Sequence, residues 1–241
     1  MAPERNNRMR QLPLEVRLAD YALFDTFYAG PNAAAVHALR DVARSGSYAF
    51  AWLWGPPDVG KSHLLQACIN EASASGARAV YLPLEPEAGL VVEALEGLGE
   101  CDIVCVDDVN RIAGNTHWER ALFVLFEGVR EFGGRMVIAA DRAPLHNRFT
   151  LPDLASRFTS GATFRLQPLS DEDKLRAMQL RAGWRGLELS DEVARFVMAR
   201  VDRRSAELFR LLDRLDREAL AAKKKLTVPF VRSVLDAAPT G

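Results

Sequence analysis

The sequence is poor in the residues that build disulfide frameworks and metal clusters. Its 241 residues include three cysteines and four histidines. Three cysteines (Cys68, Cys101 and Cys105) cannot form a disulfide framework, and the scattered histidines exclude a zinc-type cluster. Chains without disulfides are typical of reducing compartments, so we expect a cytoplasmic protein.

Long apolar runs and an excess of one charge are also lacking. No run approaches the ~20 apolar residues of a membrane span, and residues 1–10 contain no apolar stretch of the kind that signal peptides carry. Lysine and arginine number 31 against 32 aspartates and glutamates, which gives a net charge of −1. A nearly neutral chain is not expected to coat nucleic acid through bulk electrostatics. Because the sequence contains neither a membrane span nor an apolar leader, we expect no membrane partner.

The sequence does contain enough apolar residues for a core, 49% of the total. Short runs rich in β-branched and aromatic residues predict buried strands, at 49–54, 79–82, 103–106, 136–140 and 163–166. The segments between them predict helices, most clearly where apolar residues recur at helical spacing, at 33–45, 62–75, 86–98 and 117–132. Strands that alternate with helices predict an α/β fold with a parallel sheet and right-handed crossovers.

The pattern changes after Leu166, where the predicted strands stop. Hydroxyl residues placed before acidic residues or proline mark helix starts, and four helices are predicted, at 171–183, 191–200, 205–223 and 228–236. We expect three parts: a flexible tail over residues 1–20, an α/β core over 21–167 and a small helical domain over 168–241.

A glycine-rich loop follows the first predicted strand. It matches the pattern G-x-x-x-x-G-K-S, with the residues Gly55, Pro56, Pro57, Asp58, Val59, Gly60, Lys61 and Ser62. In such a loop, backbone N–H groups and the N-terminus of the following helix surround phosphate oxygens. The lysine contacts the β- and γ-phosphates, and the serine hydroxyl binds Mg²⁺. The sequence therefore predicts a nucleotide site with Mg²⁺.

Carboxylates follow two further predicted strands. Asp107 and Asp108 come directly after the run 103–106, and Asp141 follows the run 136–140. Asp107 suits a place in the outer coordination sphere of Mg²⁺. Asp108 suits the orientation or deprotonation of an attacking water. Asp141 has two interpretations, a group close to the γ-phosphate or part of an exposed turn before Pro144.

Two other segments each admit two interpretations. In residues 11–18, a proline disfavours helix and apolar residues alternate, with Gln11, Leu12, Pro13, Leu14 and Val16 as the candidate contacts. This segment is either an extended peptide for the groove of a partner or an arm packed on its own domain. The lysines at 223–225 either contact nucleic acid or complement the C-terminal dipole of a helix.

Several motifs together resemble those of the DnaA/Hda family of AAA+ P-loop ATPases. Besides the glycine-rich loop they are Phe24–Asn32, the sensor-1 segment Asp141–Pro144 and the box VII segment Leu154–Phe158, and the resemblance spans residues 22–236. It implies a sheet of order 5-1-4-3-2, a helical lid after the core, and a bound ADP or ATP. It also implies contacts to the nucleotide from Phe27 and His63.

The lid departs from the family pattern at one position. Residues 203–208 resemble the sensor-2 stretch, but Ala206 stands where the family has arginine. Arg204, or its neighbour Arg203, is the candidate replacement. The resemblance therefore implies nucleotide binding through the intact loop, with weak hydrolysis by the chain on its own.

The resemblance gives Arg157 of box VII the role of an arginine finger that completes the ATP site of another molecule. The alternative is a surface ion pair with a nearby carboxylate such as Asp153. Residues 11–18 resemble the peptide by which bacterial proteins bind the sliding clamp of DNA polymerase, although Glu15 replaces the usual proline.

The resemblance as a whole implies a regulator of bacterial chromosome replication initiation, located in the cytoplasm at the nucleoid or replisome. It is expected to bind the β sliding clamp of DNA polymerase III and to stimulate ATP hydrolysis by the initiator DnaA through Arg157, giving inactive ADP-DnaA. A homodimer is a further candidate assembly. DNA contact is expected only through the clamp, because Gly241 ends the chain before a helix-turn-helix domain. The alternatives are a helicase loader that binds single-stranded DNA and a small-molecule kinase.

Overall fold

The computed structural model describes residues 22–44, 49–85 and 88–237. Its central element is a five-stranded parallel sheet of order β2-β3-β4-β1-β5. The strands are β1 (Phe50–Trp54), β2 (Ala79–Pro83), β3 (Ile103–Asp107), β4 (Arg135–Ala140) and β5 (Ala162–Arg165). This order confirms the arrangement 5-1-4-3-2 that the family resemblance implies, read from the opposite edge.

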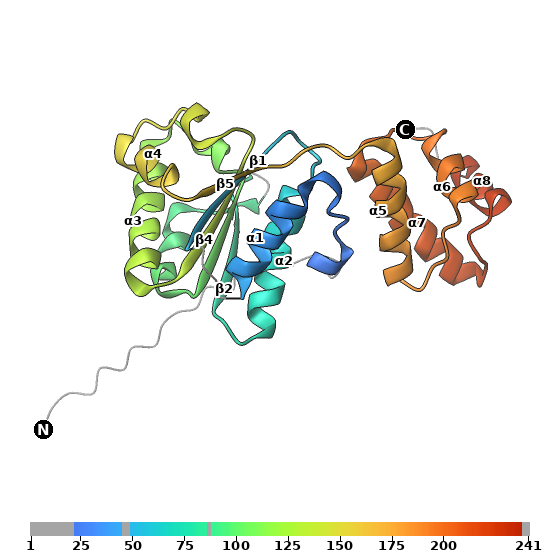
Figure 1. Ribbon diagram of the computed structural model, residues 1–241, viewed down its shortest axis with the longest axis horizontal. Coiled ribbons are helices and arrows are strands. Elements are labelled where there is room, and N and C mark those ends of the chain that lie inside the picture. The colour runs from blue at the N-terminus through green and yellow to red at the C-terminus, as the bar shows by residue number, and fades with distance from the viewer. Residues whose placement is uncertain (1–21, 45–48, 86–87, 238–241) are drawn as a thin grey trace, which may run out of the picture.

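Helices cover both faces of the sheet (Figure 1). α1 (Ala33–Ala43) and α2 (Lys61–Ala74) pack on one face, and α3 (Thr116–Phe132) and α4 (Pro152–Phe158) pack on the other. β3 and β4 are buried along their whole length, which explains why their sequences are almost continuously apolar. The periodicity of the sequence does not by itself indicate α4, which has only seven residues.

The helix predicted at 86–98 is wrong. The described part of this segment contains two short 3-10 helices, η4 (Val92–Leu95) and η5 (Leu98–Glu100). Gly89 and Gly97 have φ of +61° and +78°, values that end a right-handed helix. Glycines also cost about 1 kcal/mol each in a helix interior. Within η5, just after this segment, the backbone of Gly99 lies against Gly128 of α3, where an added Cβ would stand only 3.2 Å from the Gly128 Cα.

After β5 the described chain is helical and has its own apolar core. The helices are α5 (Asp171–Trp184), α6 (Asp191–Met198), α7 (Ser205–Ala222) and α8 (Val228–Asp236). Side-chain oxygens of Ser170, Ser190 and Thr227 accept the capping hydrogen bonds at the starts of α5, α6 and α8. The predicted helix starts are thereby confirmed. No helix among the described residues is long and apolar enough to cross a lipid bilayer.

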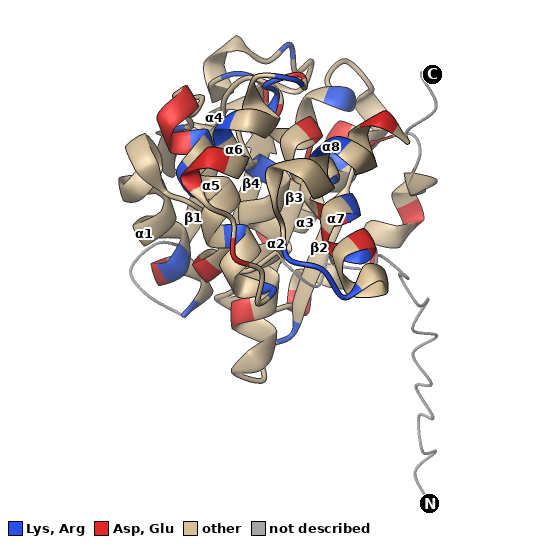
Figure 2. Cartoon of the chain, turned by 90° about the vertical axis from the view of Figure 1, so that its right-hand side faces the viewer, with Lys and Arg blue, Asp and Glu red and all other residues tan. Residues whose placement is uncertain are grey.

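Charges of both signs are mixed on the helical part. Figure 2 shows acidic and basic residues interspersed over the helices that face the viewer. Several of the arginines are paired on the surface, for example Arg195 with Asp191 at 3.2 Å and Arg203 with Asp171 at 2.5 Å. Lys223, with a φ of +51°, ends α7. Its position at this helix end fits the dipole interpretation of the lysines at 223–225.

Hydrogen bonds join the segment between the core and the helical part to the motif 24–32. Asn32 is buried, donates to the Gln167 carbonyl at 3.0 Å and accepts from the Gln167 N–H at 2.7 Å. Tyr28 donates its hydroxyl to Asp173 of α5 at 3.3 Å. These bonds hold the motif 24–32 at the boundary between the sheet and helices α5–α8.

A buried carboxylate fixes the loop that leads into α4. Glu119 of α3 is fully buried and accepts hydrogen bonds from the backbone N–H groups of Gly114, Thr150 and Leu151 and from the Thr150 hydroxyl. Burial alone would raise the pKa of Glu119, but these hydrogen bonds outweigh it and hold the pKa below its ordinary value of 4.5.

We expect Glu119→Ala to lower the free energy of unfolding by about 3 kcal/mol, because it removes a buried carboxylate that accepts several hydrogen bonds from partly buried donors. The folded-state pKa is lowered, so the stabilisation by Glu119 is present above pH 4.5 and is lost as the pH falls below that value. Urea unfolding at pH 7 and pH 4 measures both effects. Glu131→Ala, an exposed glutamate on the same helix, should change stability by less than about 0.5 kcal/mol. A small loss for Glu119→Ala would contradict the expectation.

Candidate nucleotide-binding site

A cavity of about 520 Å³ lies between the carboxyl edge of the sheet and helices α5 and α7. This volume is within the usual range for small-molecule sites. Both parts of the chain supply its walls. The predicted site residues among its lining are Phe27, Pro57, Asp58, Val59, Gly60, Lys61, Ser62, His63, Asp108 and Asp141.

Strand register explains why these residues meet. Trp54 pairs with Ala140, and Val106 pairs with Ile138, so β1, β3 and β4 end at the same edge. The N–H of Gly55 then donates to the Ala140 carbonyl at 3.3 Å. The loop 55–62 therefore begins beside the end of β4, at the edge where parallel α/β sheets bind their ligands.

Two glycines of the loop have a positive φ and surroundings that leave no room for a Cβ. Gly55 has a φ of +157°, and a Cβ there would lie 2.7 Å from the Leu166 carbonyl oxygen. Gly60 has a φ of +95°, and a Cβ there would lie 2.5 Å from the ring of Phe27. Gly60 is also the N-cap of α2, so the loop delivers the N-terminus of that helix to the cavity. This is the arrangement that binds phosphate.

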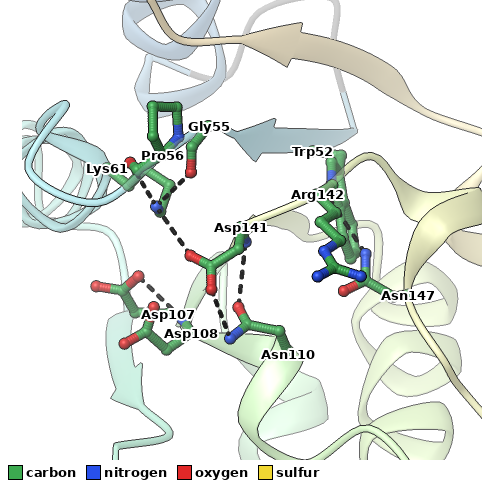
Figure 3. A network of polar contacts seen from close by, with 10 residues as sticks. All are labelled: Trp52, Gly55, Pro56, Lys61, Asp107, Asp108, Asn110, Asp141, Arg142 and Asn147. Carbon is green, nitrogen blue, oxygen red and sulfur yellow. Dashed lines mark hydrogen bonds and ion pairs between the residues drawn. The ribbon is translucent and has the colours of Figure 1, made fainter. Parts of the chain in front are cut away.

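Lys61 is buried and tied to the loop that carries it (Figure 3). Its Nζ donates to the carbonyl oxygens of Gly55 at 2.8 Å and Pro56 at 3.1 Å, and lies 3.3 Å from Asp141 Oδ1. Gly55 and Pro56 thus contribute through their backbone rather than by lining the cavity. An ammonium held at this depth is positioned to bind phosphate oxygens.

The two carboxylates after β3 have different environments. Asp107 is buried behind the cavity and accepts from the Asp108 N–H at 3.0 Å and from the Tyr81 hydroxyl at 2.7 Å. Asp108 is half-buried at the cavity wall with a φ of +54°. Burial and then the charge of Asp107 raise the pKa of Asp108 above its ordinary value of 3.8. A carboxylate of raised basicity suits a general base.

Asp141 is held by a residue that the sequence did not indicate. The side chain of Asn110 donates to Asp141 Oδ2 at 3.2 Å and accepts from the Asp141 N–H at 3.2 Å. Figure 3 shows Asp141 between Asn110 and Lys61. Of the two interpretations of Asp141, the structure therefore favours the one beside the phosphate loop.

His63 and Phe27 form the wall of the cavity next to the N-terminal motif. Their ring centroids lie 5.4 Å apart. Burial lowers the pKa of His63 to about 4, so the imidazole is neutral at pH 7 and its Nε2–H donates to the Leu23 carbonyl at 2.9 Å. A neutral His63 and an aromatic ring suit the uncharged base of a nucleotide better than its phosphates.

The lid arginines are arranged differently from the expectation. Arg204 pairs with Asp202 at 2.8 Å and with Glu207 at 3.2 Å, and neither Arg203 nor Arg204 is among the described residues that line the cavity. Arg181 of α5 and Arg210 of α7 line it instead. Sequence spacing could not identify them, because α5 and α7 come together only in the folded helical part.

Arg157 lies on α4, away from the cavity. Its Nε donates to Glu127 Oε1 of α3 at 2.6 Å, and its side chain is 41% exposed. The sequence suggested Asp153 as a local partner, but Glu127 takes that place. Residues 11–18, the candidate clamp-binding peptide, lie outside the described residues.

The cavity fits a Mg²⁺ bound together with a nucleotide. Mg²⁺ prefers oxygen ligands and binds through one or two protein groups plus phosphate oxygens. Ser62 is exposed at the start of α2, and Asp107 stands at the end of β3. No cluster of three or more histidine, cysteine, aspartate or glutamate side chains in the described ranges could hold a metal by itself. Phosphate oxygens would therefore have to complete the coordination.

Two family models match the chain over consecutive segments. Residues 18–165 match the bacterial DnaA ATPase domain, which is more than half of the chain, and residues 171–235 match the lid domain of Hda. The departure at Ala206 therefore lies within a lid that the Hda model recognises.

Solved structures agree with this assignment. Domain III of the Thermotoga maritima replication initiation protein DnaA is 26% identical, with a TM-score of 0.76, over 93% of this chain and 100% of that one. The AMPPCP-bound DnaA of Aquifex aeolicus is 21% identical, with a TM-score of 0.67, over 84% of this chain and 66% of that one. The Thermotoga maritima RuvB Holliday junction motor is 19% identical, with a TM-score of 0.60, over 87% and 67%. The latter two show a common fold.

The matches cover both halves of the cavity, the core with its phosphate loop and the helices that close it. ATPases of the DnaA type bind adenine nucleotides, which agrees with the size and composition of this cavity. The chain therefore belongs to the DnaA/Hda family of AAA+ ATPases, as a DnaA-related regulator of replication initiation with a DnaA-type core and an Hda-type lid.

Proposed function

We propose that this protein stimulates ATP hydrolysis by the initiator DnaA, using Arg157 as an arginine finger in trans. The observation that carries the proposal is the position of Arg157. It lies on α4, on the face of the sheet opposite α2, and does not line the nucleotide cavity of its own chain. This position supports a guanidinium that completes the site of another molecule rather than its own.

The surroundings of Arg157 support such a role. The side chain borders a second hollow of about 350 Å³ together with Phe50, Phe126 and Ser160. Its bond to Glu127 joins two partly exposed side chains, and pairs of this kind contribute at most about 1 kcal/mol. The arginine can exchange this partner for a phosphoryl group at low cost. An arginine finger stabilises the charge that spreads over the transferred phosphoryl in the transition state.

The nucleotide of the protein itself would have a structural role in this proposal. ADP or ATP with Mg²⁺ would bind between the loop 55–62 and helices α5 and α7, and so hold core and lid together. Asp108 and Asp141 line the same cavity and would serve slow hydrolysis there. With Ala206 at the sensor-2 position, the lid lacks the arginine that relatives place there, so we expect weak turnover by the isolated protein.

The segment 11–18 would bind the sliding clamp and bring the protein to DNA. A tether raises the effective concentration of the second contact, so a weak contact between Arg157 and DnaA suffices. DNA would then be reached through the clamp. A homodimer remains a further prediction about the assembly.

The helicase-loader alternative needs a surface that binds single-stranded DNA. Such surfaces combine a basic groove with exposed aromatic rings. The mixed charges of Figure 2 and the paired arginines of α6 and α7 do not favour it. The kinase alternative gives no role to Arg157 or to residues 11–18.

The proposal is tested by mixing the protein with DnaA bound to labelled ATP, with and without DNA-loaded clamp. We expect ADP to form rapidly only when clamp, DNA and this protein are all present. Deletion of residues 11–16 should remove most of the stimulation at low protein concentration. A high concentration of the deletion variant should restore it. ATP hydrolysis by the isolated protein that is stimulated by single-stranded DNA and insensitive to this deletion would favour the helicase loader instead.

A further inference from the structure

Tyr81 is a buried residue behind the nucleotide cavity to which neither the motifs nor the proposed function gives a role. It lies in the middle of β2 and is 9% exposed. β2 pairs with β3 in parallel register, Tyr81 with Cys105 and Pro83 with Asp107. The long side chain of Tyr81 can therefore reach the end of β3, and its hydroxyl donates to Asp107 Oδ2 at 2.7 Å.

The same hydroxyl also lies close to the helix that follows the phosphate loop. The side chains of Ser62 and Gln66, one turn apart on α2, lie near the phenol of Tyr81. Tyr81 thus binds Asp107 and lies near Ser62, the two side chains that the fit to Mg²⁺ uses. Ser62 is on α2 and Asp107 is on β3, so the phenol bridges two elements that are 45 residues apart in the sequence, from 62 to 107.

Two hydrogen bonds fix the carboxylate of Asp107. The Asp108 N–H binds Oδ1 at 3.0 Å, and the Tyr81 hydroxyl binds Oδ2 at 2.7 Å. Each carboxylate oxygen has a further lone pair that can face a cation or its water. Because the side chain is buried, its orientation depends on these bonds rather than on solvent.

We propose that Tyr81 is a positioning residue for Mg²⁺, one that holds Asp107 in the orientation in which it receives the ion, opposite Ser62, with the nucleotide. The inference rests on the proposed binding of a nucleotide with Mg²⁺. Residues that orient the ligands of a metal typically change its affinity by about 10–100-fold when they are removed. A phenol with a merely structural role would have no effect that depends on the metal.

The test compares the full-length protein with its Tyr81→Phe variant, which keeps the ring and removes the hydroxyl. The affinity for a fluorescent ADP is measured by titration in EDTA and then at increasing Mg²⁺ concentration. We expect equal ADP affinity in EDTA and a Mg²⁺ midpoint about 10-fold higher, or more, for the variant. Asp107→Asn serves as the positive control and should remove the Mg²⁺ effect.

The other outcomes overturn the inference. Equal Mg²⁺ midpoints would show that the hydroxyl does not position the ligands. A loss of ADP affinity in EDTA, or a fall in melting temperature accompanied by an unchanged midpoint, would give Tyr81 a structural role only. If the wild-type protein binds ADP without any effect of Mg²⁺, both the magnesium site and this inference fail, whereas the nucleotide site stands.

Discussion

Replacement of Arg157 by alanine is expected to abolish the stimulation of DnaA while leaving the variant folded and able to bind nucleotide and clamp. Arginine fingers supplied in trans raise hydrolysis by ~10³–10⁵-fold, so the stimulated rate should fall to nearly the rate of DnaA alone. The nucleotide cavity should not change, because Arg157 does not line it. Production of ADP by ATP-bound DnaA measures the effect, and ADP titration of the variant checks that it is intact.

The neighbouring Arg130 provides a matched control. It forms an ion pair with the same carboxylate, Glu127, and its side chain is 54% exposed. Arg130→Ala therefore alters the same ion-pair network without removing the finger, and it should keep most of the stimulation. Arg157→Lys keeps the charge but loses the planar fork that binds phosphoryl oxygens, so we expect it to be nearly as defective as alanine. Normal stimulation by Arg157→Ala would refute the assignment.

Lys61→Ala is expected to weaken the binding of ADP and ATP by about 100-fold. Lys61 Nζ is held between the Gly55 and Pro56 carbonyls and Asp141. From this position the ammonium group can exchange these partners for phosphate oxygens. Charge-assisted hydrogen bonds are each worth about 1.5–3 kcal/mol, and a 100-fold loss corresponds to about 2.7 kcal/mol.

The shift of thermal stability with nucleotide measures this loss. At an ADP concentration of about 100 times its Kd, the wild-type protein gains roughly 2.7 kcal/mol, whereas the variant at the same concentration gains about 0.4 kcal/mol. Lys224→Ala, an exposed lysine after α7, is the control and should behave as the wild type. An unchanged ADP effect in Lys61→Ala would mean that the nucleotide binds elsewhere.

The parts of the fold that the sequence predicts well are those governed by local patterns. Apolar runs locate all five strands to within a residue or two, and capping hydroxyls locate the starts of α5, α6 and α8. The failure at 86–98 occurs where local signals compete. Apolar residues there suggest a helix, but Gly89 and Gly97 adopt positive φ and Gly99 packs against the backbone of α3.

The candidate site divides in the same way. The residues of the loop 55–62, Asp107, Asp108 and Asp141 could be found from sequence, because each follows directly from a strand end or a motif. Asn110, Tyr81, Arg181 and Arg210 could not, because each reaches the site from an element whose neighbours in space are far away in the chain. Arg204 lies within the sensor-2 stretch in sequence, but it pairs with Asp202 and Glu207 and is not among the described residues that line the cavity.

The sequence by itself determined the motifs of this protein: a glycine-rich loop, carboxylates at the ends of two strands, and the succession of strands and helices that carries them. These features depend on a few adjacent residues, so a linear pattern contains them. Only the tertiary structure decided which side chains share a cavity and which face of the sheet Arg157 occupies. The position of a side chain relative to a distant one depends on strand register and helix packing, which arise from burial of the whole apolar core.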